Sequence, residues 1–140
     1  MTYTYSEKEV IEKLEEAKRL NLSGYELLAD SDVAVRECNG IGADWMPAWM
    51  RVTISTLCPS IVLAADIHDL RYFYGGNEAE RLRSDTEFLT NVELIALDYN
   101  ILRRWLVRSV GQKMYALLRS YGRWAWNYKH PHLEEKGGAK

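Results

Sequence analysis

His68 and Asp69 place an imidazole and a carboxylate side by side in a largely apolar segment that runs from Ile61 to Tyr72. Such a pair is costly to hold near a core unless both groups have partners, so it marks a candidate site. Consecutive side chains on a helix point about 100° apart, and the two groups therefore cannot bond to each other as a simple pair. We expect the His68 ring to need an acceptor and the Asp69 carboxylate to need a cation.

The helix that would carry this pair is expected over residues 60–73. Apolar and small residues recur there at three- and four-residue steps, Ser60 can cap the start, and the glycines at 75–76 end the run. A second long helical pattern opens at Asp85. If that helix returns antiparallel to the first, Asp85 can accept a hydrogen bond from His68 and fix its tautomer.

The other segments also have helical patterns, and none has the alternation of a strand. An apolar stripe continues from Asp85 through Ile101 and Leu102. Gly111 is expected to divide this helical pattern from a final helix. The polar segment 77–84 is either a loop or the start of the Asp85 helix. The expected helices cover Ser6 (with a capping box to Glu9) to about Leu20, Tyr25 to Asp30, Pro47 to Leu57, Ser60 to Phe73, Asp85 to Leu106, and Met114 to about Trp126. We therefore expect an all-α fold.

The length of 140 residues and the hydrophobic content of 47% suit one sizeable core, so we expect a single domain over residues 1–140. Its expected parts are N-terminal helices at 1–37, a core at 38–109, a basic aromatic helix at 110–128 and a mobile tail at 129–140.

The net charge of −2 conceals an uneven distribution along the chain. Residues 1–100 carry 9 basic and 18 acidic side chains, a balance of −9, whereas residues 101–140 carry 9 basic and 2 acidic, a balance of +7. The C-terminal part either suits an anionic partner, such as phospholipid head groups or nucleic acid, or docks against the acidic first part.

Cys38 and Cys58 are too few for a disulfide framework, and no apolar leader precedes the polar start. We therefore expect synthesis in a reducing compartment such as the cytoplasm. Asp66 interrupts the longest apolar run, so no membrane span is expected. The sequence leaves the oligomeric state open.

Residue spacing disfavours several kinds of chemistry. His130 and His132 flank a proline and lack a third ligand at zinc spacing, and an HD-type phosphohydrolase would need a histidine before His68. No nucleophile elbow or phosphate-binding loop is present. The segment 38–42 is either a plain turn or a glycine loop that turns its backbone onto a ligand. With Asp69 it could supply the carboxylate and carbonyl oxygens that bind a hard cation such as calcium.

Three segments, in this order along the chain, resemble the phospholipase A₂ family. Residues 39–42 (NGIG) look like its calcium loop, Cys-Gly-x-Gly, and residues 64–72 (AADIHDLRY) look like its signature, Cys-Cys-x-x-His-Asp-x-Cys-Tyr. Residues 84–88 (SDTEF) are similar to the Asp-x-x-Phe segment of the bacterial, phage and parvovirus-capsid members. Together they cover roughly residues 38–90 and are more specific than any one of them alone.

The resemblance implies calcium-dependent hydrolysis of the sn-2 ester of phospholipids. His68 would be the general base, Asp85 would orient it, and Tyr72 would hydrogen-bond that carboxylate. Calcium would be held by the Asp69 carboxylate and by the backbone carbonyls of Cys38, Gly40 and Gly42. The expected partner is a phospholipid or membrane surface, and the weaker candidates for contact with it are Trp45, Trp49, Arg123 and Trp124. Association with a virion, or release, would fit the phage-like members.

The chain also departs from the family pattern. Asn39 and the pair Ala64-Ala65 replace the cysteines that tie the calcium loop to the helix in secreted members, which fits a reducing compartment. The separation of Gly42 from His68 is longer than in the animal enzymes, so the segment from Trp45 to Leu57 is expected to be an insertion.

Two other functions stay open. The chain could be a catalytically silent phospholipase A₂-like module that binds a partner, in a phage particle or a bacterium, with His68 and Asp69 as a structural pair. The third possible function is nucleic-acid binding. It is suggested by the basic C-terminal part alone, because the sequence contains no recognisable nucleic-acid-binding motif.

Overall fold

The computed structural model describes residues 5–38 and 48–128. Within these ranges the fold is all-α, as predicted, and contains no strand. The elements are α1 (Glu7–Arg19), the 3₁₀ helix η1 (Tyr25–Ala29), α2 (Ser31–Glu37), α3 (Ala48–Leu57), α4 (Ile61–Tyr74), α5 (Glu78–Ala96), α6 (Ile101–Tyr121) and the 3₁₀ helix η2 (Gly122–Trp124).

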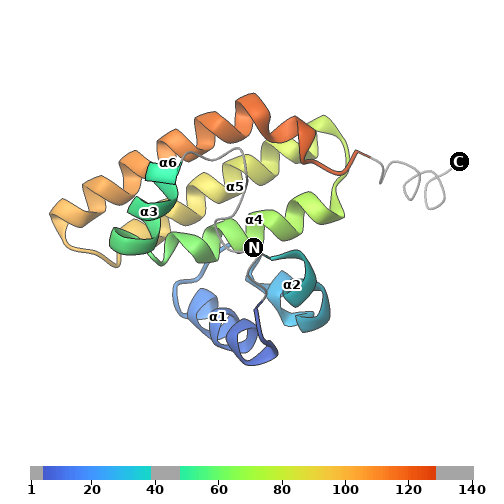
Figure 1. The fold of residues 1–140 in the computed structure, drawn as a ribbon, viewed down its shortest axis with the longest axis horizontal. Helices are drawn as coiled ribbons and strands as arrows, with labels where there is room; N and C mark the ends of the chain where they lie inside the picture. Colours follow the sequence, from blue (N-terminus) through green and yellow to red (C-terminus); the bar gives the residue numbers. More distant parts are fainter. Residues whose placement is uncertain (1–4, 39–47, 129–140) are drawn as a thin grey trace, which may run out of the picture.

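Three long helices form the body of the molecule. In Figure 1, α4, α5 and α6 lie side by side and alternate in direction, with the short α3 against α4 and α6. The N-terminal helices α1 and α2 pack beneath α4, and η1 also contacts it. Because α4 is covered on several sides, nine of its fourteen residues are buried, including Asp66 and His68.

Helix ends follow local signals at several predicted positions. Ser6 accepts a hydrogen bond from the Glu9 amide and Glu9 returns one to Ser6, so the predicted capping box of α1 is confirmed. Gly75, with φ of 68°, ends α4 as expected. Ser60 makes no cap, because its backbone is helical, with φ of −67° and ψ of −17°, and not extended as at an N-cap. Its hydroxyl accepts a hydrogen bond from Tyr99 of the α5–α6 turn at 3.2 Å.

The predicted division at Gly111 is wrong. α6 runs through this residue, and a Cβ added there would lie 2.5 Å from Cγ1 of Val92 on α5, so the glycine permits close packing of the two helices. The break falls at 97–100 instead, where the Asn100 side chain caps α6 by accepting a hydrogen bond from the Arg103 amide at 2.9 Å. The predicted boundary between residues 109 and 110 therefore cuts a continuous helix.

Two further segments are helical where the sequence left a choice or gave no helix. Asn77 opens α5 with a capping box to Glu80, so the segment 77–84 belongs to the helix rather than to a loop. Residues 31–37 form α2, capped by Asp30, where the sequence indicated only a lead into the glycine loop. Among the described helices, none combines the length and the apolar character needed to cross a membrane.

Candidate functional site

His68 and Asp85 meet in the interior between α4 and α5. The His68 Nε2 atom lies 2.8 Å from Oδ1 of Asp85, and the Tyr72 hydroxyl donates to the same oxygen at 2.7 Å. His68 and Tyr72 are four residues apart and therefore share one face of α4, with their ring centroids 4.2 Å apart. The two contacts predicted for Asp85, with His68 and with Tyr72, are confirmed. Their roles in a reaction stay predictions.

The other oxygen of Asp85 faces two arginines that sequence reasoning missed. Arg119 of α6 donates to Oδ2 at 2.5 Å, and Arg81, one turn before Asp85 on α5, lies 3.6 Å from it. Arg81 is itself 4% exposed and is held by Glu78 and by the carbonyl of Leu118. The four-residue spacing to Arg81 was a usable signal, whereas nothing local in the sequence points to Arg119.

These contacts decide the ionisation of the buried carboxyl. Burial raises the pKa of Asp85, but hydrogen bonds from His68 and Tyr72, with a further one from Arg119, outweigh it, and the resulting pKa lies below the ordinary value. Burial and the hydrogen bond to Asp85 raise the pKa of Tyr72. At neutral pH Asp85 is therefore an ionised acceptor, so the His68 nitrogen that faces it carries the proton.

Asp69 lies next to this pair in sequence but faces a different space. It is partly exposed and lines an open hollow of about 770 Å³, here called the Asp69 hollow. Two carboxylates and several aromatic rings share the wall, and its lining includes Glu37, Asp69, Phe73, Arg123, Trp124 and Tyr128. His68 does not line this hollow, but Tyr72 does. The hollow therefore borders the pair formed by His68 and Asp85.

The segment after η2 forms one side of the Asp69 hollow and is tied to the end of α4. The Asn127 amide donates to the Tyr72 carbonyl at 3.2 Å, and its side-chain amide donates to the Phe73 carbonyl at 2.8 Å. The Trp126 indole donates to the Gly76 carbonyl at 2.9 Å. Residues 122–128 are therefore fixed on the element that carries His68 and Asp69.

The expected calcium loop is described only at its start. Gly40, Gly42 and the membrane candidate Trp45 lie outside the described residues. Cys38 is buried, and its thiol donates to the Asp66 carbonyl of α4 at 3.5 Å, so this end of the loop is anchored to the helix without a disulfide. Burial, followed by the charges of Asp66 and Asp69, raises the pKa of the Cys38 thiol.

The Asp69 hollow has two carboxylates in its lining, and carboxylate oxygens are ligands that hard cations prefer. Asp69 and Glu37 both line the hollow, and Cys38 follows Glu37 directly. Residues 5–38 and 48–128 contain no group of three or more His, Cys, Asp or Glu side chains placed to hold a metal. The expected calcium ligands are one carboxylate and several backbone carbonyls. The absence of a cluster of three side-chain ligands therefore does not bear on that expectation.

The three described candidates for membrane contact fall into two places. Arg123 and Trp124 line the Asp69 hollow, where the Arg123 guanidinium lies 4.4 Å from the centre of the Trp124 ring. Trp49 is exposed on α3 and takes no part in that lining. The structure thus brings two of the three to the candidate site.

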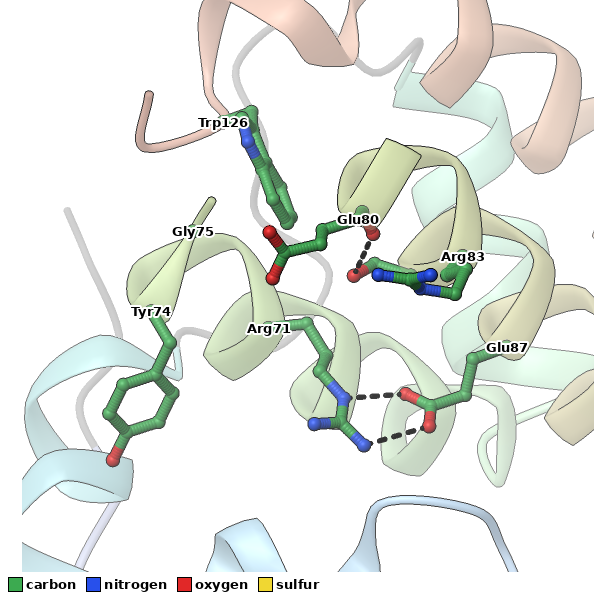
Figure 2. Close-up of a pocket in the computed structure, with 8 residues that line it drawn as sticks. Arg71, Tyr74, Gly75, Glu80, Arg83, Glu87 and Trp126 are labelled. Atoms are coloured by element: carbon green, nitrogen blue, oxygen red, sulfur yellow. Dashed lines mark hydrogen bonds and ion pairs between the residues drawn. The ribbon is translucent and has the colours of Figure 1, made fainter. Parts of the chain in front are cut away.

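A smaller hollow of about 380 Å³ lies on the other side of Trp126, between α4 and α5 (Figure 2). Arg71 donates to both carboxylate oxygens of Glu87 at 2.9 Å, and Ser84 donates to the Glu80 carbonyl of its own helix at 2.9 Å. These polar groups are engaged with one another. The Arg71–Glu87 pair joins α4 and α5, the two helices that carry His68 and Asp85.

Comparisons with protein families, with curated proteins and with solved structures found no significant match for this chain. The function proposed below therefore depends on the side-chain geometry and on the resemblance in sequence.

Proposed function

We propose that this chain is a phospholipase A₂-like enzyme that hydrolyses the sn-2 ester of phospholipids with calcium. The observation that carries the proposal is the buried contact of 2.8 Å between His68 Nε2 and Asp85 Oδ1, with Tyr72 on the same oxygen. Asp69, the next residue after His68, lines an open hollow beside this pair. A general base next to a cation-binding carboxylate is the arrangement that this reaction requires.

The chain's own residues supply the proton transfers. Asp85 is ionised and holds the proton of His68 on Nε2, so the lone pair of the imidazole is on Nδ1. His68 Nδ1 takes a proton from water as the water oxygen bonds to the ester carbonyl carbon. When the bond to the glycerol oxygen breaks, the same nitrogen returns the proton to that oxygen, and a fatty acid and a lysophospholipid result.

Asp69 and the carbonyls of Cys38, Gly40 and Gly42 are the groups that would hold calcium. When bound, calcium supplies a Lewis acid that stabilises negative charge on the ester oxygen and on the phosphate. The aromatic wall of the Asp69 hollow offers apolar surface to the substrate, and Arg123 offers a cation to its phosphate.

The test is calcium-dependent release of fatty acid from mixed phospholipid vesicles. His68→Asn keeps a side-chain donor for Asp85 but removes the base, and we expect it to lower the rate by about 10²–10⁴-fold. Asp69→Asn should abolish the calcium-dependent release of fatty acid, because it removes the carboxylate that would hold calcium. Asp32→Asn, at an exposed acidic position on α2, is the matched control and should leave the rate unchanged. A parent protein that neither releases fatty acid nor binds calcium by calorimetry would refute the proposal.

One observation favours a second candidate, a catalytically silent module of the same fold. Arg119 and Arg81 already balance the Asp85 charge, which weakens the support that this carboxylate gives to a protonated His68. In that case calcium binding would be weak, and His68→Asn would change stability without changing any rate.

A further inference from the structure

Four apolar side chains are exposed where α5 turns into α6. Leu97 is 57% exposed, Ile101 81%, Leu102 82% and Trp105 70%, and these four residues are here called the α5–α6 tip. In the sequence, Ile101 and Leu102 continue the apolar stripe of helical spacing that opens at Asp85. In the structure, the buried face of α6 begins only at Val107.

The α5–α6 tip stands at one end of the molecule. Figure 1 shows the turn between the two helices at the left, away from the segment after α6 that lines the Asp69 hollow. Leu97 caps the end of α5 and is twelve residues after Asp85, which corresponds to about 18 Å along the helix axis. A contact made by the tip would therefore leave the Asp69 hollow open.

Cationic side chains surround the tip, and the nearby acidic ones are already paired. Arg103 is exposed, with its guanidinium 5.6 Å from the centre of the Tyr99 ring. Asp98 pairs with Arg19 at 3.1 Å, and Glu93 accepts from an arginine of α6 at 2.8 Å. On α6, Arg108 and Arg119 are paired with acidic residues of α5. Arg103 and Arg104, between Leu102 and Trp105 in the sequence, make no ion pair with the described residues. The tip therefore combines apolar side chains with the positive charge of Arg103 and Arg104.

We propose that the α5–α6 tip docks on an anionic phospholipid bilayer, with its apolar side chains among the lipid head groups. Contiguous exposed apolar residues mark an interaction surface, and Trp with neighbouring Arg is the composition that binds the boundary between lipid and water. The tip protrudes at a turn between two helices, a shape that a fluid bilayer accommodates without a preformed pocket. Anionic lipid complements the positive charge of Arg103 and Arg104. The docking needs no hydrolysis and goes beyond the function proposed above.

The test is co-sedimentation with vesicles in the presence of a calcium chelator, so that hydrolysis plays no part. The parent should bind vesicles of equal phosphatidylglycerol and phosphatidylcholine, bind phosphatidylcholine alone at least about tenfold more weakly, and lose binding as salt rises. Leu102→Ser and Trp105→Ser should each reduce binding by about tenfold, because each removes one inserted apolar side chain. Arg103→Gln should reduce it by about fivefold.

Ile11→Ser is the matched control, because Ile11 is 52% exposed on α1, and it should bind as the parent does. All the substituted side chains are exposed, so circular dichroism should show parental helix content. Absence of binding to anionic vesicles, or parental binding by both Leu102→Ser and Trp105→Ser, would overturn the proposal. The proposal would also be overturned if light scattering showed that the parent is a dimer and that Trp105→Ser dissociates it, because the tip would then be a protein interface. Failure of the esterase assay alone would leave this result standing.

Discussion

Replacing Asp85 by Asn should destabilise the fold far more than a typical change of one atom. The carboxylate is fully buried and accepts from His68, Tyr72 and Arg119, while Arg81 lies 3.6 Å away and is itself buried. The Asn amide removes the charge that pairs with Arg119, leaves Arg81 with Glu78 as its charged partner, and turns a donor toward other donors. Removing one partner of a buried ion pair costs about 3–5 kcal/mol.

The assay is urea unfolding at pH 7, followed by far-ultraviolet circular dichroism. With a denaturant slope of about 1.5–2 kcal/mol/M, the midpoint should fall by about 1.5–3 M. Tyr72→Phe is a milder second variant that keeps the ring and removes one hydrogen bond to the charged group, and it should cost about 1.5–3 kcal/mol. It keeps the test informative if Asp85→Asn does not fold.

The exposed Asp32→Asn is the control here too and should change the free energy of unfolding by less than about 0.5 kcal/mol. If Asp85→Asn and Tyr72→Phe both stayed within that same range, the buried network would not be holding α4, α5 and α6 together, and the reasoning would be refuted.

Three further outcomes follow from the geometry. Gly111→Ala should cost about 1–3 kcal/mol in urea unfolding, because its Cβ would lie 2.5 Å from Val92, and Val92→Ala in the same chain should recover part of the loss. Gly75→Ala should lower the melting temperature in calorimetry, since φ is 68° there and the added Cβ would lie 2.1 Å from the Asn127 carbonyl; an unchanged value would contradict this contact. The lowered pKa of Asp85 contributes stability that is complete above its unfolded pKa of about 4 and is lost as the pH falls. Unfolding free energy should therefore decline from about pH 5 downward, and less steeply in Asp85→Asn.

The sequence predicted the features that depend on local signals and on helical period. The capping box at Ser6, the helix that carries His68 and its end at Gly75 each follow from residues within a few positions of the feature. The contact between His68 and Asp85 was also predictable, because two helices joined by a short turn must run antiparallel and both residues lie on inward faces.

The features that were missed depend on contacts between distant segments. Gly111 is a helix breaker by local propensity, but tertiary packing against Val92 overrides that preference. Arg119 reaches Asp85 from 34 residues away, which no spacing rule anticipates. Ile101 and Leu102 continue an apolar pattern whose partner surface ends before them, and helical period alone does not reveal that they stay exposed.

The ion pair between Arg119 and Asp85 also orders events during synthesis of the chain. His68 and Asp85 leave the ribosome while Arg119 is still 34 residues behind, which corresponds to about 2–7 s at 5–20 residues per second. During that interval α4 and α5 can pair, but the second oxygen of the carboxylate has only Arg81 beside it. Closure of the interior therefore waits for the end of α6, and a nascent chain halted before Arg119 should be cleaved readily by protease where the complete one resists.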